Sequence, residues 1–297
     1  MALRIVVAGE IYLDQVFAGF AAWPEPGEEA FAKSLTREAG GGAAITAAGL
    51  ARLGWDVSLI GPVGNDPAGT DLRSRIERLG LRTNTLYEHA SEPTGTTVAI
   101  SMPEDRTFFT YRGANADLEA ALRGVPEADH LHIAAPCDAA LLGWLCKRAK
   151  TVSVDVGLQL EWLRDETMQD ALRSAAWFFP NEKEAAVVTG EAEPEAMLER
   201  FDALGIRAAV KLGTCGSATV IDGRYVQVAS IQVQPIDTTG AGDCFNAGFL
   251  DAWLREEPLA LCLQSGNICG ALSTREMGGM NGFPTREELS EWRSKSL

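Results

Sequence analysis

The chain has 297 residues, enough for one large domain or two ordinary ones with a sizeable hydrophobic core. Hydrophobic residues make up 46% of it and charged residues 23%, proportions typical of a globular protein. The formal net charge of −15 argues against a nucleic-acid partner, because binding a polyanion needs a positive surface. No stretch is long and apolar enough to cross a membrane, and no secretory-signal pattern is visible. We therefore expect a cytoplasmic protein with no membrane partner.

Extended and helical patterns alternate along the chain, which is typical of a mostly parallel sheet covered by helices. Buried strands are predicted at residues 3–7, 56–60, 130–133, 152–154 and 208–210. Helices are predicted at residues 43–53 and from Asp66, which can cap a helix that has Pro67 at its first position. No repeat or interdomain linker is visible, so we expect a single α/β domain over residues 1–297.

Two segments interrupt this alternation. Residues 12–36 mix polar and aromatic side chains, and residues 94–102 and 107–111 predict a hairpin that turns at residues 103–106. A second hairpin is predicted around the turn sequence Asp222-Gly223-Arg224.

The most informative stretch is Asp237-Thr238-Thr239-Gly240-Ala241-Gly242-Asp243, which leads into an amphipathic helix. The turn formed by Gly240, Ala241 and Gly242 would present backbone N–H groups at the positive end of the helix dipole, a ready anion site. Asp243 stands inside that first turn. It is a poor ligand for an anion but a suitable proton acceptor for a hydroxyl that attacks phosphorus. The alternative is that Asp243 only caps the helix.

This stretch resembles the C-terminal signature of the ribokinase-like carbohydrate kinases, the phosphofructokinase-B type family. Other family landmarks follow in the expected order: Gly-Gly-Gly-Ala-Ala at 40–44, Ala-Arg-Leu-Gly at 51–54, Pro-Asn-Glu-Lys-Glu at 180–184 and Val-Lys-Leu-Gly-Thr-Cys-Gly at 210–216. The resemblance runs from about Ile5 to Pro284. It implies an α/β three-layer sandwich with a central, mostly parallel sheet and a small β-sheet lid. The lid would be discontinuous, from about 12–38 and 94–112, and would exclude water from the site.

The activity implied by the resemblance is ATP-dependent transfer of the γ-phosphoryl group to a primary hydroxyl of a monosaccharide, of pentose or ketohexose type. Asp243 would be the catalytic base, and residues 240–242 would form the anion hole. The ATP-binding residues would be Asn181, Lys211, Gly213, Gly216 and Asn267. Glu184 would act on Mg²⁺ through water, which suits an ion that keeps several waters.

A monovalent cation is also expected by resemblance, with Asp237 and Thr239 at the positions of its ligands and K⁺ as the ion. Carbonyl groups near residues 277–282 would complete the site. The alternative is that Asp237 caps the turn through an Asx hydrogen bond. Family resemblance further suggests a homodimer formed through the lid.

The expected sugar-binding residues are Asp14, Gly41, Gly42, Arg112 and Asn115. A carboxylate such as Asp14 can accept hydrogen bonds from two vicinal hydroxyls. The family usually has Asn where this chain has Ile45, so one hydroxyl contact is missing or comes from elsewhere. An acidic sugar is disfavoured, because its carboxylate would want two cationic contacts and only Arg112 is evident.

Other functions remain open at this point. A nucleoside kinase of the same family could use an apolar Ile45 and aromatic lid residues against a base. A sugar-binding regulator without catalysis is another class, although the intact residues 240–243 argue against it. An ATP-dependent dehydratase on the same scaffold is disfavoured by the sugar-kinase signature at the N-terminus. No P-loop sequence occurs, and Ile45 stands where a dinucleotide fingerprint needs its third glycine.

Overall fold

A five-stranded parallel sheet forms the centre of the computed structural model, which describes residues 3–102 and 106–295. Its order is β11-β10-β9-β1-β4, and the strands are β1 (Ile5–Gly9), β4 (Val57–Ile60), β9 (Ala128–Ala134), β10 (Ala149–Asp155) and β11 (Trp177–Phe178). Four of these match predicted strands. The strand predicted at 208–210 is shifted to β12 (Val210–Lys211), which joins β13 instead, and residue Ala208 only bridges to Phe178.

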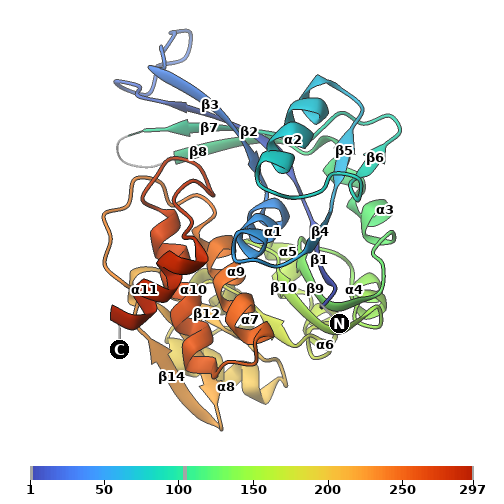
Figure 1. Cartoon of the computed structure of the whole chain (residues 1–297), viewed down its shortest axis with the longest axis vertical. Coiled ribbons are helices and arrows are strands. Elements are labelled where there is room, and N and C mark those ends of the chain that lie inside the picture. Colours follow the sequence, from blue (N-terminus) through green and yellow to red (C-terminus); the bar gives the residue numbers. More distant parts are fainter. Residues whose placement is uncertain (1–2, 103–105, 296–297) are drawn as a thin grey trace.

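Helices cover both faces of this sheet, because the strand side chains alternate between two hydrophobic clusters. Ile5 and Val7 point to one cluster, while Val6 and Ala8 point to the other. The first cluster is covered by α1 (Gly42–Arg52), α2 (Pro67–Arg78), α9 (Ala241–Leu254), α10 (Leu259–Ser273) and α11 (Arg286–Lys295). The second is covered by α3 (Leu118–Leu122), α4 (Ala139–Leu145), α5 (Leu160–Arg164), α6 (Glu166–Leu172), α7 (Glu182–Thr189) and α8 (Pro194–Ala203). The predicted three-layer α/β fold is confirmed (Figure 1).

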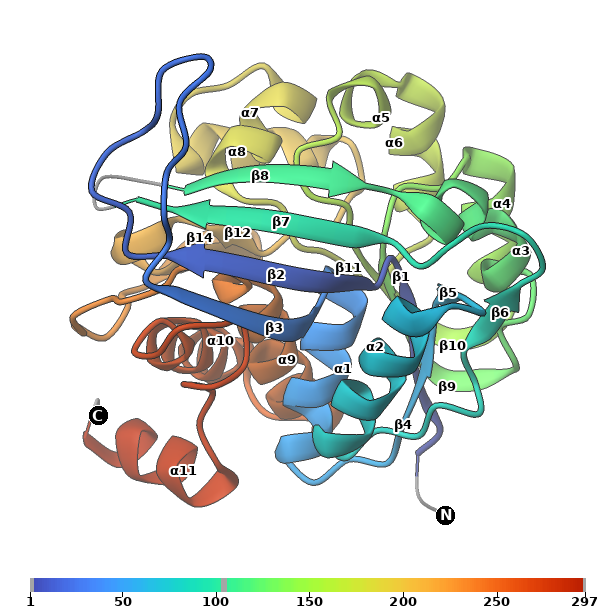
Figure 2. The ribbon, with the colours of Figure 1, turned by 90° about the horizontal axis from the view of Figure 1, so that it is seen from above.

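A four-stranded sheet stands apart from the central one. Figure 2 shows its strands side by side in the order β3 (Ser34–Gly40), β2 (Tyr12–Ala18), β7 (Thr96–Ser101) and β8 (Arg106–Tyr111). The pair β2–β7 is parallel and the outer pairs are antiparallel. These are the segments for which the resemblance implies a lid, and that role stays a prediction. Most of the predicted turn at 103–106 lies outside the described residues.

The remaining strands form two small sheets: β5 (Pro62–Gly64) with β6 (Tyr87–His89), and β12 with β13 (Ser217–Ile221) and β14 (Arg224–Val228). Two 3₁₀ turns, η1 (Gly113–Asp117) and η2 (Gly213–Cys215), are also present in the described part of the chain. The predicted hairpin forms at β13–β14, where Asp222 and Gly223 have φ of 50° and 73°. Positive φ at both central residues is the signature of a type I′ turn. None of the described helices is long and apolar enough to span a membrane.

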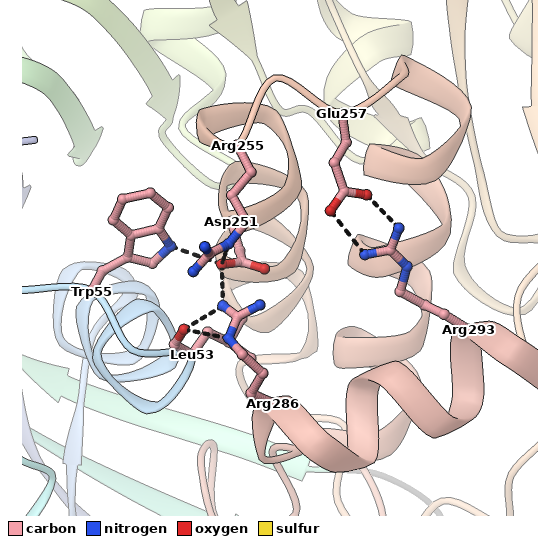
Figure 3. Close-up of polar contacts among 7 residues, drawn as sticks. All are labelled: Leu53, Trp55, Asp251, Arg255, Glu257, Arg286 and Arg293. Atoms are coloured by element: carbon pink, nitrogen blue, oxygen red, sulfur yellow. Dashed lines mark hydrogen bonds and ion pairs between the residues drawn. The ribbon is translucent and has the colours of Figure 1, made fainter.

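Ion pairs fasten α11 to the helices beneath it (Figure 3). Asp251 of α9 has no exposed surface, and its Oδ1 accepts hydrogen bonds from Trp55 Nε1 at 2.7 Å and Arg255 Nε at 3.0 Å. Arg286, the first residue of α11, reaches the same oxygen and also donates through Nε to the Leu53 carbonyl at 2.8 Å. Asp251 therefore links α9, α11 and the end of α1.

Candidate active site

The first turn of α9 carries the predicted anion hole. Gly240 precedes the helix with a left-handed φ of 69°, a conformation that favours glycine. A side chain there would also collide with Ile45, whose Cδ1 lies 2.7 Å from the position of a Cβ. The N–H groups of the first helical turn have no partner within the helix, although Ala241 N–H reaches back to the Thr238 carbonyl at 3.3 Å.

Two cavities are lined in part by residues of this turn. A cavity of 280 Å³ is lined by Thr238, Ala241 and Gly242, and another of 260 Å³ is lined by Asp243 and Gly42. The backbone of the turn thus borders the first cavity, while the carboxylate of Asp243 faces the second. A group bound at the turn would lie between the two cavities.

The first cavity gathers most of the residues predicted to bind ATP. Lys211, Gly213, Gly216 and Asn267 all line it, and Asn181 is not among its lining residues. Asn267 Nδ2 donates to the Val228 carbonyl at 2.8 Å, which joins α10 to the end of β14. Gly216 has a φ of 96°, and a Cβ there would meet the Val228 carbonyl oxygen at 2.0 Å, so only glycine fits.

Asp243 lies where the N-termini of two helices converge. It is in the first turn of α9, and its Oδ1 is 2.7 Å from the position of a Cβ on Gly42, the first residue of α1. Burial raises the pKa of Asp243 to about 7, and the carboxylates of Asp155 and Glu184 also favour its neutral form, while Lys211 opposes them. A carboxyl group with this pKa is suited to accept a proton near neutral pH.

A buried ion pair lies close enough to Asp243 to affect its pKa. Lys211 Nζ contacts Asp155 Oδ2 at 2.6 Å, and Asn246 Nδ2 donates to the same oxygen at 2.6 Å. Burial alone would raise the pKa of Asp155, but Lys211 outweighs it and the net shift is downward. The pKa of Lys211 is raised, because Asp155 and Glu184 outweigh the opposing effect of its burial. Asp155 therefore stays ionised and Lys211 stays charged beside Asp243.

Asp155 and Asn246 were missed by the sequence analysis as site residues. Asp155 ends β10, and polar residues at the carboxyl end of a parallel strand are the usual position for ligand contacts. Asn246 follows Asp243 by three residues, so both lie on one face of α9. Both signals are present in the sequence.

Asn181 and Glu184, expected near phosphate and Mg²⁺, form a capping box at the start of α7. Glu184 accepts hydrogen bonds from the Asn181 backbone N–H at 2.8 Å and from its Nδ2 at 2.7 Å, and Asn181 Oδ1 accepts from the Glu184 N–H at 3.0 Å. Burial raises the pKa of Glu184. Across the described residues, no group of three or more His, Cys, Asp or Glu side chains is arranged to hold a metal directly. An ion contacted through water remains a prediction.

The residues expected to bind the sugar lie in several places. Gly42 lines the second cavity. Asp14 lies on β2 against Gly40, and burial raises the pKa of its carboxyl group to about 7. Gly41 is required for backbone reasons, since its φ is 88° and a Cβ would lie 2.4 Å from the Glu10 carbonyl oxygen. Asn115 is fully buried, and its amide exchanges two hydrogen bonds with the Ile11 backbone, at 3.1 Å and 2.8 Å.

Two further expectations take a different form in the structure. Arg112 donates to Glu10 at 2.6 Å, so its charge already has a partner. Ile45 is buried and packs against Gly240 and Gly279, and it lines neither of the two cavities. Ile45 therefore packs against the turn at Gly240.

Asp237 joins the loop before α9 to the loop that follows α10. Its Oδ1 accepts from the Thr239 N–H at 2.7 Å, which is the Asx hydrogen bond considered above, and its Oδ2 accepts from the Gly278 N–H at 2.8 Å. The carboxylate is 1% exposed. The structure thus brings Asp237 and Thr239 next to the 277–282 segment, where further ligands of a cation were expected.

The fold and this arrangement define a ribokinase-like sugar kinase. Residues 2–286 match the sequence profile of the pfkB family carbohydrate kinases, and the chain belongs to this family. It is 28% identical over 293 residues to a ribokinase of Bacillus subtilis, covering 97% of this chain and 98% of that one. It is 32% identical over 303 residues to an ATP-dependent ribose-1-phosphate kinase of Halopiger xanaduensis, covering 99% of both.

Solved structures agree with this assignment. Arabidopsis thaliana ribokinase complexed with ribose and ATP has a TM-score of 0.82 and 26% identity, and the match covers 98% of this chain and 99% of that one. The family predicted from the sequence is confirmed, and the protein is an ATP-dependent carbohydrate kinase.

Proposed function

We propose that the protein phosphorylates a primary hydroxyl of an uncharged monosaccharide of pentose or ketohexose type, with Asp243 as the catalytic base. The observation that carries this proposal is the position of the α9 first turn between two cavities, with Gly242 bordering one and Asp243 facing the other. ATP would lie in the first cavity, beside Lys211, and the sugar in the second.

In this arrangement Asp243 accepts the proton of the sugar hydroxyl as that oxygen forms a bond to the γ-phosphorus, and ADP departs with the electrons of the bond that breaks. The backbone N–H groups at 240–242 and the ammonium of Lys211 stabilise the charge on the transferring group. Mg²⁺ bound to ATP would neutralise phosphate charge, with Glu184 and Asn181 as its contacts through water. Asp155 holds Lys211 in place.

A coupled ADP-release screen tests the proposal. The protein is assayed with Mg²⁺ and ATP against pentoses, ketohexoses, sugar acids, sugar phosphates and nucleosides. We expect turnover with a neutral pentose or ketohexose. Turnover with nucleosides alone would replace this proposal by a nucleoside kinase, and sugar binding without turnover would favour a regulator.

We also propose that K⁺ binds beside Asp237 and stiffens the Gly240–Gly242 turn. Support comes from the two hydrogen bonds by which this carboxylate joins the turn to Gly278, since an ion there would touch both loops. Rates in potassium, sodium and a bulky organic cation at equal ionic strength test it. Equal rates in all three would reject activation.

The sheet β3-β2-β7-β8 is proposed as a lid and as the surface of a homodimer. Leu35, Phe109 and Tyr111 project from one face of it, and each is between 48% and 56% exposed. Exposed apolar patches of this kind mark interaction surfaces. Sedimentation analysis should give a dimer for the wild type and a monomer for Phe109→Glu. A wild-type monomer at assay concentration would contradict the dimer.

A further inference from the structure

An ion pair stands at the edge of the 260 Å³ cavity. Glu10 follows β1 and lines the cavity, and its Oε1 accepts a hydrogen bond from Arg112 Nη2 at 2.6 Å. The Glu10 side chain is 17% exposed, while that of Arg112 is 54% exposed. Tyr12 also lines the cavity and lies beside both partners. Burial raises its pKa most, Glu10 raises it further and Arg112 lowers it.

The charged residues that line this cavity are acidic, and two of them are paired with basic side chains. Three of its lining residues are carboxylates: Glu10, Asp155 and Asp243. Asp155 is paired with Lys211, and Glu10 is paired with Arg112. None of the described residues that line the cavity carries a positive charge. A carboxylate or phosphate on the acceptor would therefore enter a partly desolvated site next to carboxylates, without a counter-ion.

We propose that Glu10 determines specificity by engaging Arg112, so that the cavity admits uncharged polyhydroxy acceptors and rejects anionic ones. This inference rests on the proposed function and narrows its substrate class. Like-charge juxtaposition is an effective way to reject a wrong partner, because the penalty applies only to the charged ligand. A neutral side chain at position 10 would leave Arg112 free to pair with an acidic acceptor.

The test compares the wild type with Glu10→Gln and with Glu88→Gln. Glu88 is the control, since it also pairs with an arginine, Arg73, at 3.1 Å, and it lies outside both cavities. Each enzyme is assayed for kcat/KM with ribose and fructose and with the matching sugar acids and sugar 1-phosphates. We expect Glu10→Gln to shift the ratio of anionic to neutral acceptors upward by at least about tenfold, equivalent to about 1.4 kcal/mol.

Three results would overturn the inference. The first is a ratio of anionic to neutral kcat/KM in Glu10→Gln that does not differ from the ratio in Glu88→Gln, and the second is a wild type that prefers an anionic acceptor. The third is an upward shift of the ratio that persists in the double variant Glu10→Gln/Arg112→Gln. That double variant should lose the gain, because the gain depends on the released guanidinium. Calorimetric titration of the same compounds measures the ratio of their binding affinities, which does not depend on turnover. If no compound is phosphorylated by the wild type, the proposed function fails, while the binding ratios still decide the role of Glu10.

Discussion

At the scale of single residues, the account depends on the state of Asp243. Its pKa is raised from 3.8 to about 7, chiefly by burial, so the group is protonated below pH 7 and ionised above it. Only the ionised form can accept the hydroxyl proton. We therefore expect kcat/KM to fall by up to tenfold for each pH unit below about 7 and to level off above it.

Initial rates from pH 5 to 9 check this expectation, with the affinity for Mg²⁺-ATP measured separately over the same range to remove the titration of the nucleotide. A flat profile down to pH 5 would contradict the role of a base with a raised pKa.

Gly42 leaves the space in which this carboxylate lies. The Cβ of Gly42→Ala would lie 2.7 Å from Asp243 Oδ1, so the carboxylate must move. We expect kcat to fall by at least about tenfold, because small displacements of reacting groups are costly. Stability should hold, since alanine favours helix over glycine.

The matched control is Gly143→Ala in α4, where a Cβ meets nothing within 4 Å. Rates and thermal unfolding of both variants would be compared. Normal turnover by Gly42→Ala would show that the carboxylate is not held against α1.

At the scale of elements, the first turn of α9 is expected to act as an anion hole. A Cβ on Gly242 would lie 3.3 Å from Lys211 Nζ, so Gly242→Val would press on the lysine and fill the edge of the first cavity. We expect kcat to fall by about 10²-fold, comparable to the loss of one oxyanion donor, with a much smaller change in thermal stability. Normal turnover by a folded variant would show that this turn is only a helix cap.

Local sequence signals were sufficient to predict most of the helices and strands. The Asp66 cap is an example: its Oδ1 accepts from the Gly69 N–H at 2.8 Å and Pro67 begins α2, as predicted. The fold followed from alternating patterns and family motifs. Element ends were less certain, because β1 and β9 extend beyond their apolar runs, to Gly9 and Ala134, through pairing with neighbouring strands.

At the scale of the whole molecule, long-range pairs decide what the sequence could not show. Asp155 and Lys211 are separated by 56 positions, and only the fold brings the end of β10 and the end of β12 together. The same reason applies to Ile45, which stands where the family usually has Asn and was expected to leave one hydroxyl contact missing; the packing of α1 on α9 directs its side chain to Gly240. Asn115 reaches the Ile11 backbone across 104 positions. Such contacts depend on topology and leave no local pattern.

Asp251 is also held by long-range contacts, with Trp55 and Arg286, and we expect it to contribute strongly to stability. Asp251→Ala would remove the shared acceptor of Trp55, Arg255 and Arg286 (Figure 3). The two arginines are 38% and 36% exposed and can turn to water, so we expect the free energy of unfolding to fall by about 1–3 kcal/mol, the cost of leaving partly buried donors without their acceptor. Denaturant unfolding would measure it, with Glu288→Ala as control, since its pair with Arg275 is one-third exposed and should contribute at most about 1 kcal/mol. Equal losses in both variants would contradict the linking role of Asp251.

The central claim is that Asp243 takes the proton from an acceptor hydroxyl in the second cavity, as that hydroxyl attacks the phosphoryl group held at the first turn of α9. The most direct measurement is kcat and sugar affinity of Asp243→Asn, which keeps the shape of the side chain and removes its basicity. The account predicts a fall in kcat of about 10²- to 10⁴-fold with sugar affinity nearly unchanged. A variant that keeps more than about a third of the wild-type kcat would contradict it.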